Sequence, residues 1–354
     1  MAEPGAGGAA PGEPRAPGEP RAPSARRADD RRARLLRGVL DDPENDDAKR
    51  VYADELLQAG DPRGELIQLE LALAGPLAIR RRDQLRQRHT ELRAAWFSTW
   101  FPYKVGAIRT RGGFASSVRA TFGQLRAAGA LFATEPVVEV AVELDPANAA
   151  ELAGAPWLGR LRRLIVRGGL GDAGLTALWS SPGVAQLRAL NVTGCGVGPS
   201  ALAGADLSSP GDALPVLDTL VLSGNPLGDA GLAGLGRWPG LARLETLYVS
   251  RARASLVGLE ALLAGGALPR LRKLCLSRNA LGAAAGAVIA QYADRLPGLR
   301  HLELVATGAT LDGVAAIVAA KLPALATLDV RDNPVARDRA LRPIAAGLAP
   351  YVRV

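Results

Sequence analysis

One apolar pattern, LxxLxL, recurs eight times from residue 137 onward, at intervals of 24 to 30 residues. The eight segments are VVEVAV from Val137, LRRLIV from Leu161, LRALNV from Leu187, LDTLVL from Leu217, LETLYV from Leu244, LRKLCL from Leu271, LRHLEL from Leu299 and LATLDV from Leu325. A unit of this length cannot bury its apolar face alone, so neighbouring copies must stack and share one core. The repeat therefore predicts an elongated solenoid over residues 137–354.

Each segment predicts a short strand followed by a helix. The fourth and sixth residues point inward, whereas the third, fifth and seventh face outward on the concave side. The second half of each unit, such as GDAGLAGL from Gly228, has helical spacing and small residues. The ninth residues are Asp145, Gly169, Cys195, Asn225, Ala252, Asn279, Thr307 and Asn333. We expect the polar ones to hydrogen-bond the turning backbone, and YVRV (351–354) to add a partial ninth strand.

These segments resemble leucine-rich repeats, and the resemblance covers residues 137–350. It implies an α/β fold, namely a leucine-rich-repeat solenoid of the ribonuclease-inhibitor-like subclass with about eight repeats. It also implies that the asparagine ladder of such repeats uses the ninth positions, where Cys195 is an accepted structural alternative.

The N-terminal part of the chain predicts three further regions. Residues 1–27 repeat GEPRAP and hold almost no large apolar side chain, which predicts a disordered tail. Residues 28–104 predict a small all-α bundle of four helices. Its core face includes Val51, Tyr52, Leu56 and Leu57 in the second helix. The fourth, Arg-rich helix carries Ile79, Leu85, Leu92, Trp96 and Phe97. Residues 105–136 predict a hairpin with a Gly-Gly turn, then a helix capped by Thr121, which together form an N-terminal cap of the solenoid.

The segment VYADELLQAGDPRGELIQLE (51–70) is rich in carboxylates. Gly60 predicts a helix stop, and Asp61 with Pro62 predicts the next helix start. We place Glu55 and Glu70 on polar helix faces, which favours a structural junction over acid/base catalysis. The YAD helix and GDPRGE turn resemble a bacterial repeat-companion domain, a family that implies architecture and no assigned chemistry.

Net charge raises nucleic acid as an alternative partner. The formal charge is +8, and all of the excess lies in residues 101–354. Basic residues are interleaved with acidic ones, and aromatic residues, which would stack on bases, make up only 4% of the chain. We therefore interpret the basic residues as a solvated surface, and keep a nucleic-acid-associated scaffold as the alternative.

The chain has two cysteines and two histidines. This excludes a disulfide framework and a Cys/His zinc site. The run DDPENDD (41–47) lacks the EF-hand spacing, and the glycine-rich turns lack a phosphate-loop context. The remaining enzyme hypothesis is a Cys275 nucleophile with His301 as base and Glu303 as orienting acid. We expect no catalytic residue, metal or cofactor.

The outward positions vary from repeat to repeat, whereas the inward ones stay apolar. This predicts a non-catalytic protein–protein interaction scaffold that binds its partner on the concave face, with Tyr and Arg as favoured anchors. The predicted partner-binding residues are Arg163, Arg167, Asn191, Tyr248, Lys273, His301, Glu303, Asp329 and Arg331. No apolar run is long enough to span a membrane, and no signal core opens the chain. We expect a cytoplasmic monomer with a protein partner.

Overall fold

The computed structural model describes residues 23–203, 214–320, 322–337 and 352–353. The chain forms two compact units, unit 1 (Met1–Ala94) and unit 2 (Ala95–Val354). The boundary lies inside helix α4 (Ile79–Trp100) and not at residue 104 as predicted. The domain limit is therefore earlier than the sequence pattern indicated.

Unit 1 holds three complete helices and most of α4. The complete helices are α1 (Pro23–Asp41), α2 (Asp46–Gln58) and α3 (Arg63–Ala74). The predicted tail needs a correction, because α1 already begins at Pro23 and so includes residues 23–27. The segment Ala25–Ala28 consists of Ala and Arg, which favour helix and extend α1 backward. Residues 1–22 of the predicted tail lie outside the described residues.

The junction between α2 and α3 follows the sequence prediction closely. Gly60 has φ +74°, which is the left-handed conformation expected at a helix stop. The Asp61 carboxylate accepts a hydrogen bond from the Arg63 backbone N–H at 2.9 Å, so Asp61 caps α3. Helix α3 begins at Arg63, one residue after the predicted start at Pro62. Glu65 pairs with Arg88 of α4 through two contacts of 2.7 and 2.8 Å.

The predicted core face of α2 is partly wrong. Tyr52 and Leu56 are buried, but Val51 and Leu57 are 49% and 39% exposed. Lys49 is buried instead, and its Nζ lies 2.8 Å from the Asp46 carboxylate one helical turn earlier. This local ion pair makes burial of the amine tolerable, and the alkyl stem then packs as an apolar group.

Three further expectations for unit 1 are also wrong. Glu55 is buried and lies 3.0 Å from Arg31, and Glu70 is largely shielded, 3.1 Å from His89, so neither sits on a solvated face. Ile79, the first residue of α4, is 81% exposed, and Trp96 near its end is 41% exposed. Both carboxylates thus contact basic side chains of the same helical unit, which supports a structural junction between helices over acid/base catalysis.

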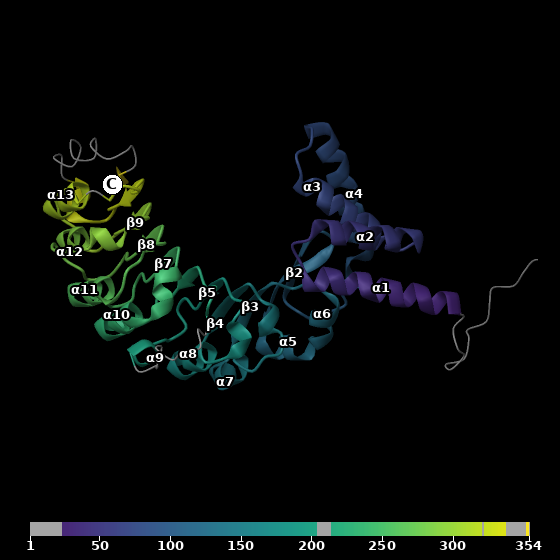
Figure 1. Cartoon of the computed structure of the whole chain (residues 1–354), viewed down its shortest axis with the longest axis horizontal. Helices are drawn as coiled ribbons and strands as arrows, with labels where there is room; N and C mark the ends of the chain where they lie inside the picture. Colours follow the sequence, from purple (N-terminus) through teal and green to yellow (C-terminus); the bar gives the residue numbers. More distant parts are fainter. Residues whose placement is uncertain (1–22, 204–213, 321, 338–351, 354) are drawn as a thin grey trace, which may run out of the picture. The chain divides into compact units, whose positions relative to one another are not determined.

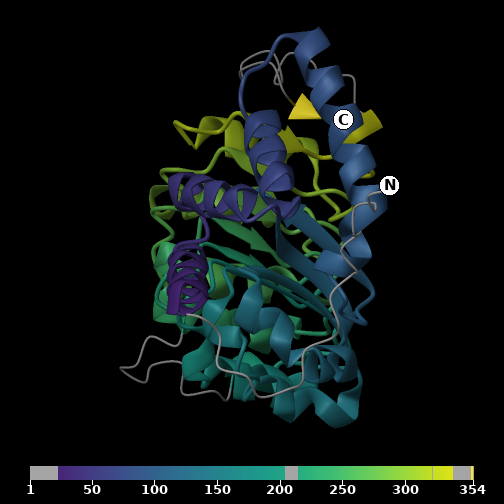
Figure 2. The ribbon, with the colours of Figure 1, turned by 90° about the vertical axis from the view of Figure 1, so that its right-hand side faces the viewer.

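The described residues of unit 2 form one sheet of eleven strands that follow one another in chain order. The strands are β1 (Ala107–Arg111), β2 (Phe114–Thr121), β3 (Glu139–Leu144), β4 (Arg163–Gly168), β5 (Ala189–Asn191), β6 (Thr219–Val221), β7 (Thr246–Tyr248), β8 (Lys273–Cys275), β9 (His301–Glu303), β10 (Thr327–Asp329) and β11 (Val352–Arg353). Strands β1 and β2 pair antiparallel, as the predicted hairpin, and the other strand pairs of the described residues are parallel. Each of the eight LxxLxL segments supplies one strand, and β11 pairs with β10 as the predicted ninth repeat strand. Successive strands are visible side by side in Figures 1 and 2.

The repeat helices lie together on one side of this sheet (Figure 1). They are α7 (Ala149–Leu152), α8 (Gly171–Trp179), α9 (Ser200–Ala203), α10 (Gly228–Arg237), α11 (Leu256–Gly265), α12 (Ala285–Gln291) and α13 (Leu311–Ala319). Short 3-10 turns complete several of the connections. The outward face of β3–β10 is therefore left uncovered by the helices of its own repeats.

The cap before the repeats contains two short helices, α5 (Phe122–Ala127) and α6 (Gly129–Thr134), where one was predicted. Thr121 caps α5 reciprocally with Gln124, as a capping box. The helix breaks at Ala128, which has φ −96° and ψ 34°. Glu135 is 1% exposed and accepts the Ala115 backbone N–H at 2.8 Å, so it ties the cap to the hairpin.

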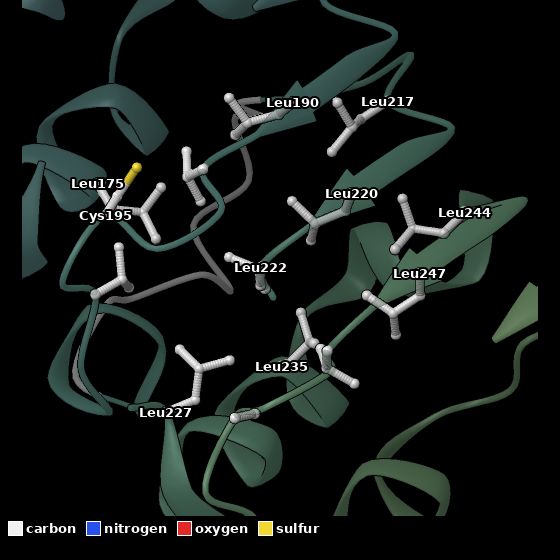
Figure 3. Close-up of a cluster of buried hydrophobic side chains, with 14 of the residues drawn as sticks. Leu175, Leu190, Cys195, Leu217, Leu220, Leu222, Leu227, Leu235, Leu244 and Leu247 are labelled. Carbon is white, nitrogen blue, oxygen red and sulfur yellow. The ribbon is translucent and has the colours of Figure 1, made fainter. Parts of the chain in front are cut away.

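The core of unit 2 is the inward face of the repeats. The fourth and sixth residues of all eight segments are at most 1% exposed. Figure 3 shows Leu190, Leu220 and Leu247 from three successive strands pointing into this interior. Burying such side chains contributes about 1.5 to 3 kcal/mol each, so the shared core is the main source of stability.

A ladder of buried side-chain amides joins neighbouring repeats at the ninth position. Asn225, Asn279 and Asn333 each accept backbone N–H groups of the preceding repeat and donate to carbonyls on both sides. Cys195 takes the same position as a buried thiol that donates to the Val166 carbonyl at 3.2 Å. Asp145 is an exception, since it is exposed and caps a 3-10 turn through the Ala147 N–H. The predicted ladder is thus present without Asp145.

Candidate functional site

The outward side chains of the repeat strands form rows because the parallel strands pair without any shift of register. Third-position residues pair with third-position residues, and fifth with fifth, from β3 to β10. Arg353 of β11 extends the fifth-position row beyond Asp329. Neighbouring strands lie about 4.8 Å apart, so adjacent members of a row can touch. This face holds all nine predicted partner-binding residues.

The N-terminal part of this face carries paired charges. Arg163 of β4 lies 2.7 Å from Glu139 of β3, and Arg119 of β2 lies 3.2 Å from Glu143. Arg167 is exposed and has no ion pair among the described residues. It borders a hollow of about 680 Å³ at the ends of β2–β4, which Arg119 and Glu143 also line. Arg167 is therefore the cation that this end offers to a ligand.

The middle of the face is neutral. The outward residues there are Ala189, Asn191, Thr219, Val221 and Thr246, and all are half-buried. The Asn191 carbonyl oxygen accepts the N–H and the hydroxyl of Thr193, at 2.9 and 2.7 Å. This predicted contact residue is thus already engaged in a local turn, and its amide nitrogen is what it can present.

The C-terminal part holds a connected polar group, the Glu303 cluster, which consists of Tyr248, Ser250, Lys273, Cys275 and Glu303. Lys273 Nζ lies 2.7 Å from Glu303 Oε1 and 5.0 Å from the centre of the Tyr248 ring. The Cys275 thiol donates to Glu303 Oε2 at 2.9 Å, and Ser250 Oγ lies 3.0 Å from the sulfur. The cluster spans three adjacent strands, so the backbone register holds it in place.

Electrostatics in the Glu303 cluster favour the charged carboxylate and amine. Burial raises the pKa of Glu303, but hydrogen bonds from Cys275 and Lys273 outweigh it, so the net pKa is below the usual value. Burial lowers the pKa of Lys273, but the bonds to Glu303 and Tyr248 raise it further, and the net pKa is raised. Both groups are therefore ionised at neutral pH.

A second acid lies next to Glu303 in the fifth-position row. Asp329 of β10 is 4% exposed, and Arg331 holds it with a fork of contacts at 2.7, 2.9 and 3.1 Å. Burial raises the pKa of Asp329, but the Arg331 bonds bring it below its usual value. Two neighbouring carboxylates can stay ionised here because each has its own cation.

The structure thus joins some predicted residues and separates others. Tyr248, Lys273 and Glu303 meet in one cluster, whereas His301 is exposed beside Lys273 and outside it. The sequence reasoning missed Ser250 as a member. The strand pattern could have identified it, because Ser250 is two residues after Tyr248 and therefore faces the same side of the sheet.

The cysteine-nucleophile hypothesis finds no support in this geometry. The Cys275 thiol bonds to Glu303, Ser250 and Ser277, and no hydrogen bond to His301 occurs among the described residues. Burial, helped by the adjacent carboxylate, raises the pKa of Cys275 above its usual range. Burial also raises the pKa of Cys195, to about 11. A raised pKa lowers the fraction of each cysteine that is thiolate at neutral pH, and the thiolate is the nucleophilic form.

We expect both cysteines to react slowly with iodoacetamide. At pH 9 a thiol of pKa about 11 is only about 1% ionised, whereas a model thiol of ordinary pKa is mostly ionised. The folded protein should label at least about tenfold more slowly than glutathione at the same pH, by intact-mass measurement. The same protein in urea is the control and should label at the model rate. Rapid labelling of folded Cys275 would revive the nucleophile hypothesis.

The rest of the described chain shows little other chemistry. A second hollow of about 480 Å³ lies in the cap, between α5, α6 and the Trp157 loop. Among the residues that the structure describes, no three His, Cys, Asp or Glu side chains are grouped as metal ligands. Within those same residues, none of the helices has the length and apolar character needed to cross a membrane.

A comparison with known protein families supports a leucine-rich-repeat fold. A family model described as a leucine-rich repeat matches residues 213–236, so the chain contains a leucine-rich repeat. No curated protein matches the sequence. Among solved structures, an internalin from Listeria monocytogenes is similar at 16% identity and a TM-score of 0.39, over 66% of this chain and 69% of that one. A Bacteroides fragilis protein is similar at 14% identity and a TM-score of 0.36, over 56% of this chain and 67% of that one.

Proposed function

We propose that unit 2 is a non-catalytic protein-binding scaffold whose partner sits on the outward face of β3–β10. One observation carries the proposal: the repeat helices all lie on the other side of the sheet, so this face is left uncovered by its own repeats. The inward residues are uniformly apolar, while the outward ones differ from strand to strand. Varied side chains on a rigid, uncovered sheet suit recognition of a specific partner surface.

The pattern of charge supports a partner of mixed polarity. Paired charges occupy both ends of the face, and the neutral middle offers the apolar Ala189 and Val221. Pairing orients the charged groups in advance, which lowers the entropy lost on binding. Tyr248 is the natural anchor, since it is a large ring held beneath Lys273.

We further propose the finer assignments that the sequence suggested. Residues 137–354 form about eight repeats of the ribonuclease-inhibitor-like subclass, and unit 1 is a bacterial repeat-companion domain. A cytoplasmic location and a monomeric state stay predictions. A nucleic-acid scaffold remains the alternative, favoured only by the excess of positive charge in residues 101–354.

Affinity capture with matched variants tests the proposal. The concave variant combines Arg167→Ala, Tyr248→Ala and His301→Ala, which spares the ion pairs and the buried ladder. The convex control combines Val257→Ala, Glu260→Ala and Gln291→Ala, which are exposed positions on α11 and α12. We expect quantitative mass spectrometry to show a protein captured by the wild type and the control but depleted from the concave variant. Equal capture by all three would contradict a concave binding site.

A further inference from the structure

The eighth residue of seven consecutive LxxLxL segments adopts the left-handed backbone conformation. These residues are Gly168, Gly194, Gly224, Arg251, Arg278, Ala306 and Asp332, with φ between 52° and 100°. They form a row where the strands turn away from the concave face. Glycine takes this conformation without steric cost, and it occupies the first three places. Arginine occupies the next two, although a side chain is strained there.

A third arginine lies in the same turn as Arg251. Arg253 has φ 58°, whereas the matching residues two places after Gly194 and Ala306 are the glycines Gly196 and Gly308. Three arginines in two adjacent repeats thus stand where several other repeats use glycine, while Ala306 and Asp332 fill the last two places of the eighth-position row. Residues held in this strained conformation cluster at binding sites and other functional sites, which makes the arginines of these turns candidates for a binding role.

The three arginines are close in space and lack internal partners. The Arg251 N–H donates to the carbonyl of Ser277, the residue just before Arg278, at 3.0 Å. All three side chains are exposed. Among the described residues, none of them makes an ion pair or a side-chain hydrogen bond, unlike Arg163, Arg119 and Arg331 on the same sheet. The nearest acid in the row is Asp332, two strands beyond Arg278.

We propose that Arg251, Arg253 and Arg278, here called the arginine edge, bind the carboxylates of an acidic segment of the partner protein. This deepens the proposed function and rests on it, because the edge borders the concave face beside Tyr248 and Ser250. Guanidinium groups match carboxylates in a two-pronged geometry, and unpaired ones need no internal bond to be broken first.

Several observations favour an acidic protein segment over a nucleic acid. The turns that carry the arginines hold no aromatic side chain on which a base could stack. Tyr248, the nearest outward ring, is only half-exposed and lies against Lys273. The fifth-position row of the same face contains the ionised acids Glu303 and Asp329, which disfavour a phosphate chain laid across the sheet. A protein can place carboxylates on the edge and other groups opposite those acids.

The test uses the full chain and a fluorescein-labelled deca-glutamate peptide, measured by fluorescence anisotropy at low and at physiological salt. The edge variant combines Arg251→Gly, Arg253→Gly and Arg278→Gly. Glycine occupies equivalent positions in other repeats, so the fold should be kept, and a thermal unfolding midpoint no lower than the wild type checks this. The charge control combines Arg162→Gln, Arg188→Gln and Arg300→Gln, exposed residues at the opposite ends of the strands.

We expect the edge variant to bind the peptide at least about tenfold more weakly than the wild type and the charge control, with a shallower salt dependence. Three results would overturn the proposal. They are no binding by the wild type, equal weakening in both variants, and tighter edge-dependent binding of an oligothymidine of equal charge. If the protein that the wild type captures is lost by the concave variant but kept by the edge variant, the scaffold stands and the acidic-segment proposal fails.

Discussion

Replacing Asn279 by alanine should lower the free energy of unfolding by about 3 to 5 kcal/mol. The Asn279 amide is 3% exposed and makes four backbone hydrogen bonds. Its oxygen accepts the N–H groups of Ala252 and Ala254 at 2.8 and 3.2 Å, and its nitrogen donates to Val249 and Leu276, both at 2.8 Å. Alanine leaves these buried groups unpaired, at about 1 to 3 kcal/mol each before the turn relaxes. Urea unfolding followed by circular dichroism measures the loss.

Asn191→Ala is the matched control for this experiment. It is the same chemical change in another repeat, but among the described residues the Asn191 side chain bonds to Thr193 alone, in an exposed turn. We expect it to cost about 1 kcal/mol or less. Equal effects of the two substitutions would mean that the buried amide ladder does not hold the repeats together.

Gly286→Ala should also be strongly destabilising, by at least about 3 kcal/mol. A Cβ on Gly286 of α12 would lie 2.0 Å from the Gly313 carbonyl oxygen and 2.4 Å from its Cα, both backbone atoms of α13. No side-chain rotation relieves such a clash, so the two helices must separate and open the core beneath them. The unfolding midpoint in urea reports the change.

Gly123→Ala separates this clash from a general effect of alanine on glycine. Gly123 lies in helix α5, where an added Cβ meets nothing within 4 Å. The substitution should stabilise the protein by about 0.5 to 1 kcal/mol, because glycine is a poor helix former. If Gly286→Ala behaved like Gly123→Ala, the close approach of α12 and α13 would be wrong.

The sequence predicted the parts of the fold that depend on period and local chemistry. The leucine spacing gave the strand positions, because burial of one sheet face fixes the register. Gly60, Asp61 and Thr121 predicted their caps, since a cap is set by a few adjacent residues. These features need no knowledge of what lies across the fold.

Features that depend on tertiary neighbours were less predictable. Lys49 is buried while Val51 is exposed, because the packing of α2 is decided by the other helices and by the Asp46 contact. In the candidate site, the outward face could be predicted from the strand pattern. The hydrogen bond between Cys275 and Glu303 could not be predicted, because several side chains on adjacent strands compete for the Glu303 carboxylate. Backbone strain at the arginine edge carries no sequence signature when the residue is not glycine.

The central claim is that recognition uses the outward face of the repeat sheet. Its most direct test is the dissociation constant of the captured protein, purified and titrated calorimetrically against the wild type, the concave variant and the convex control. We predict that the concave variant weakens binding by about 2 kcal/mol or more, roughly thirtyfold, while the control matches the wild type. Weakening by the convex control alone, with the concave variant unchanged, would contradict the account and place the interface on the helices.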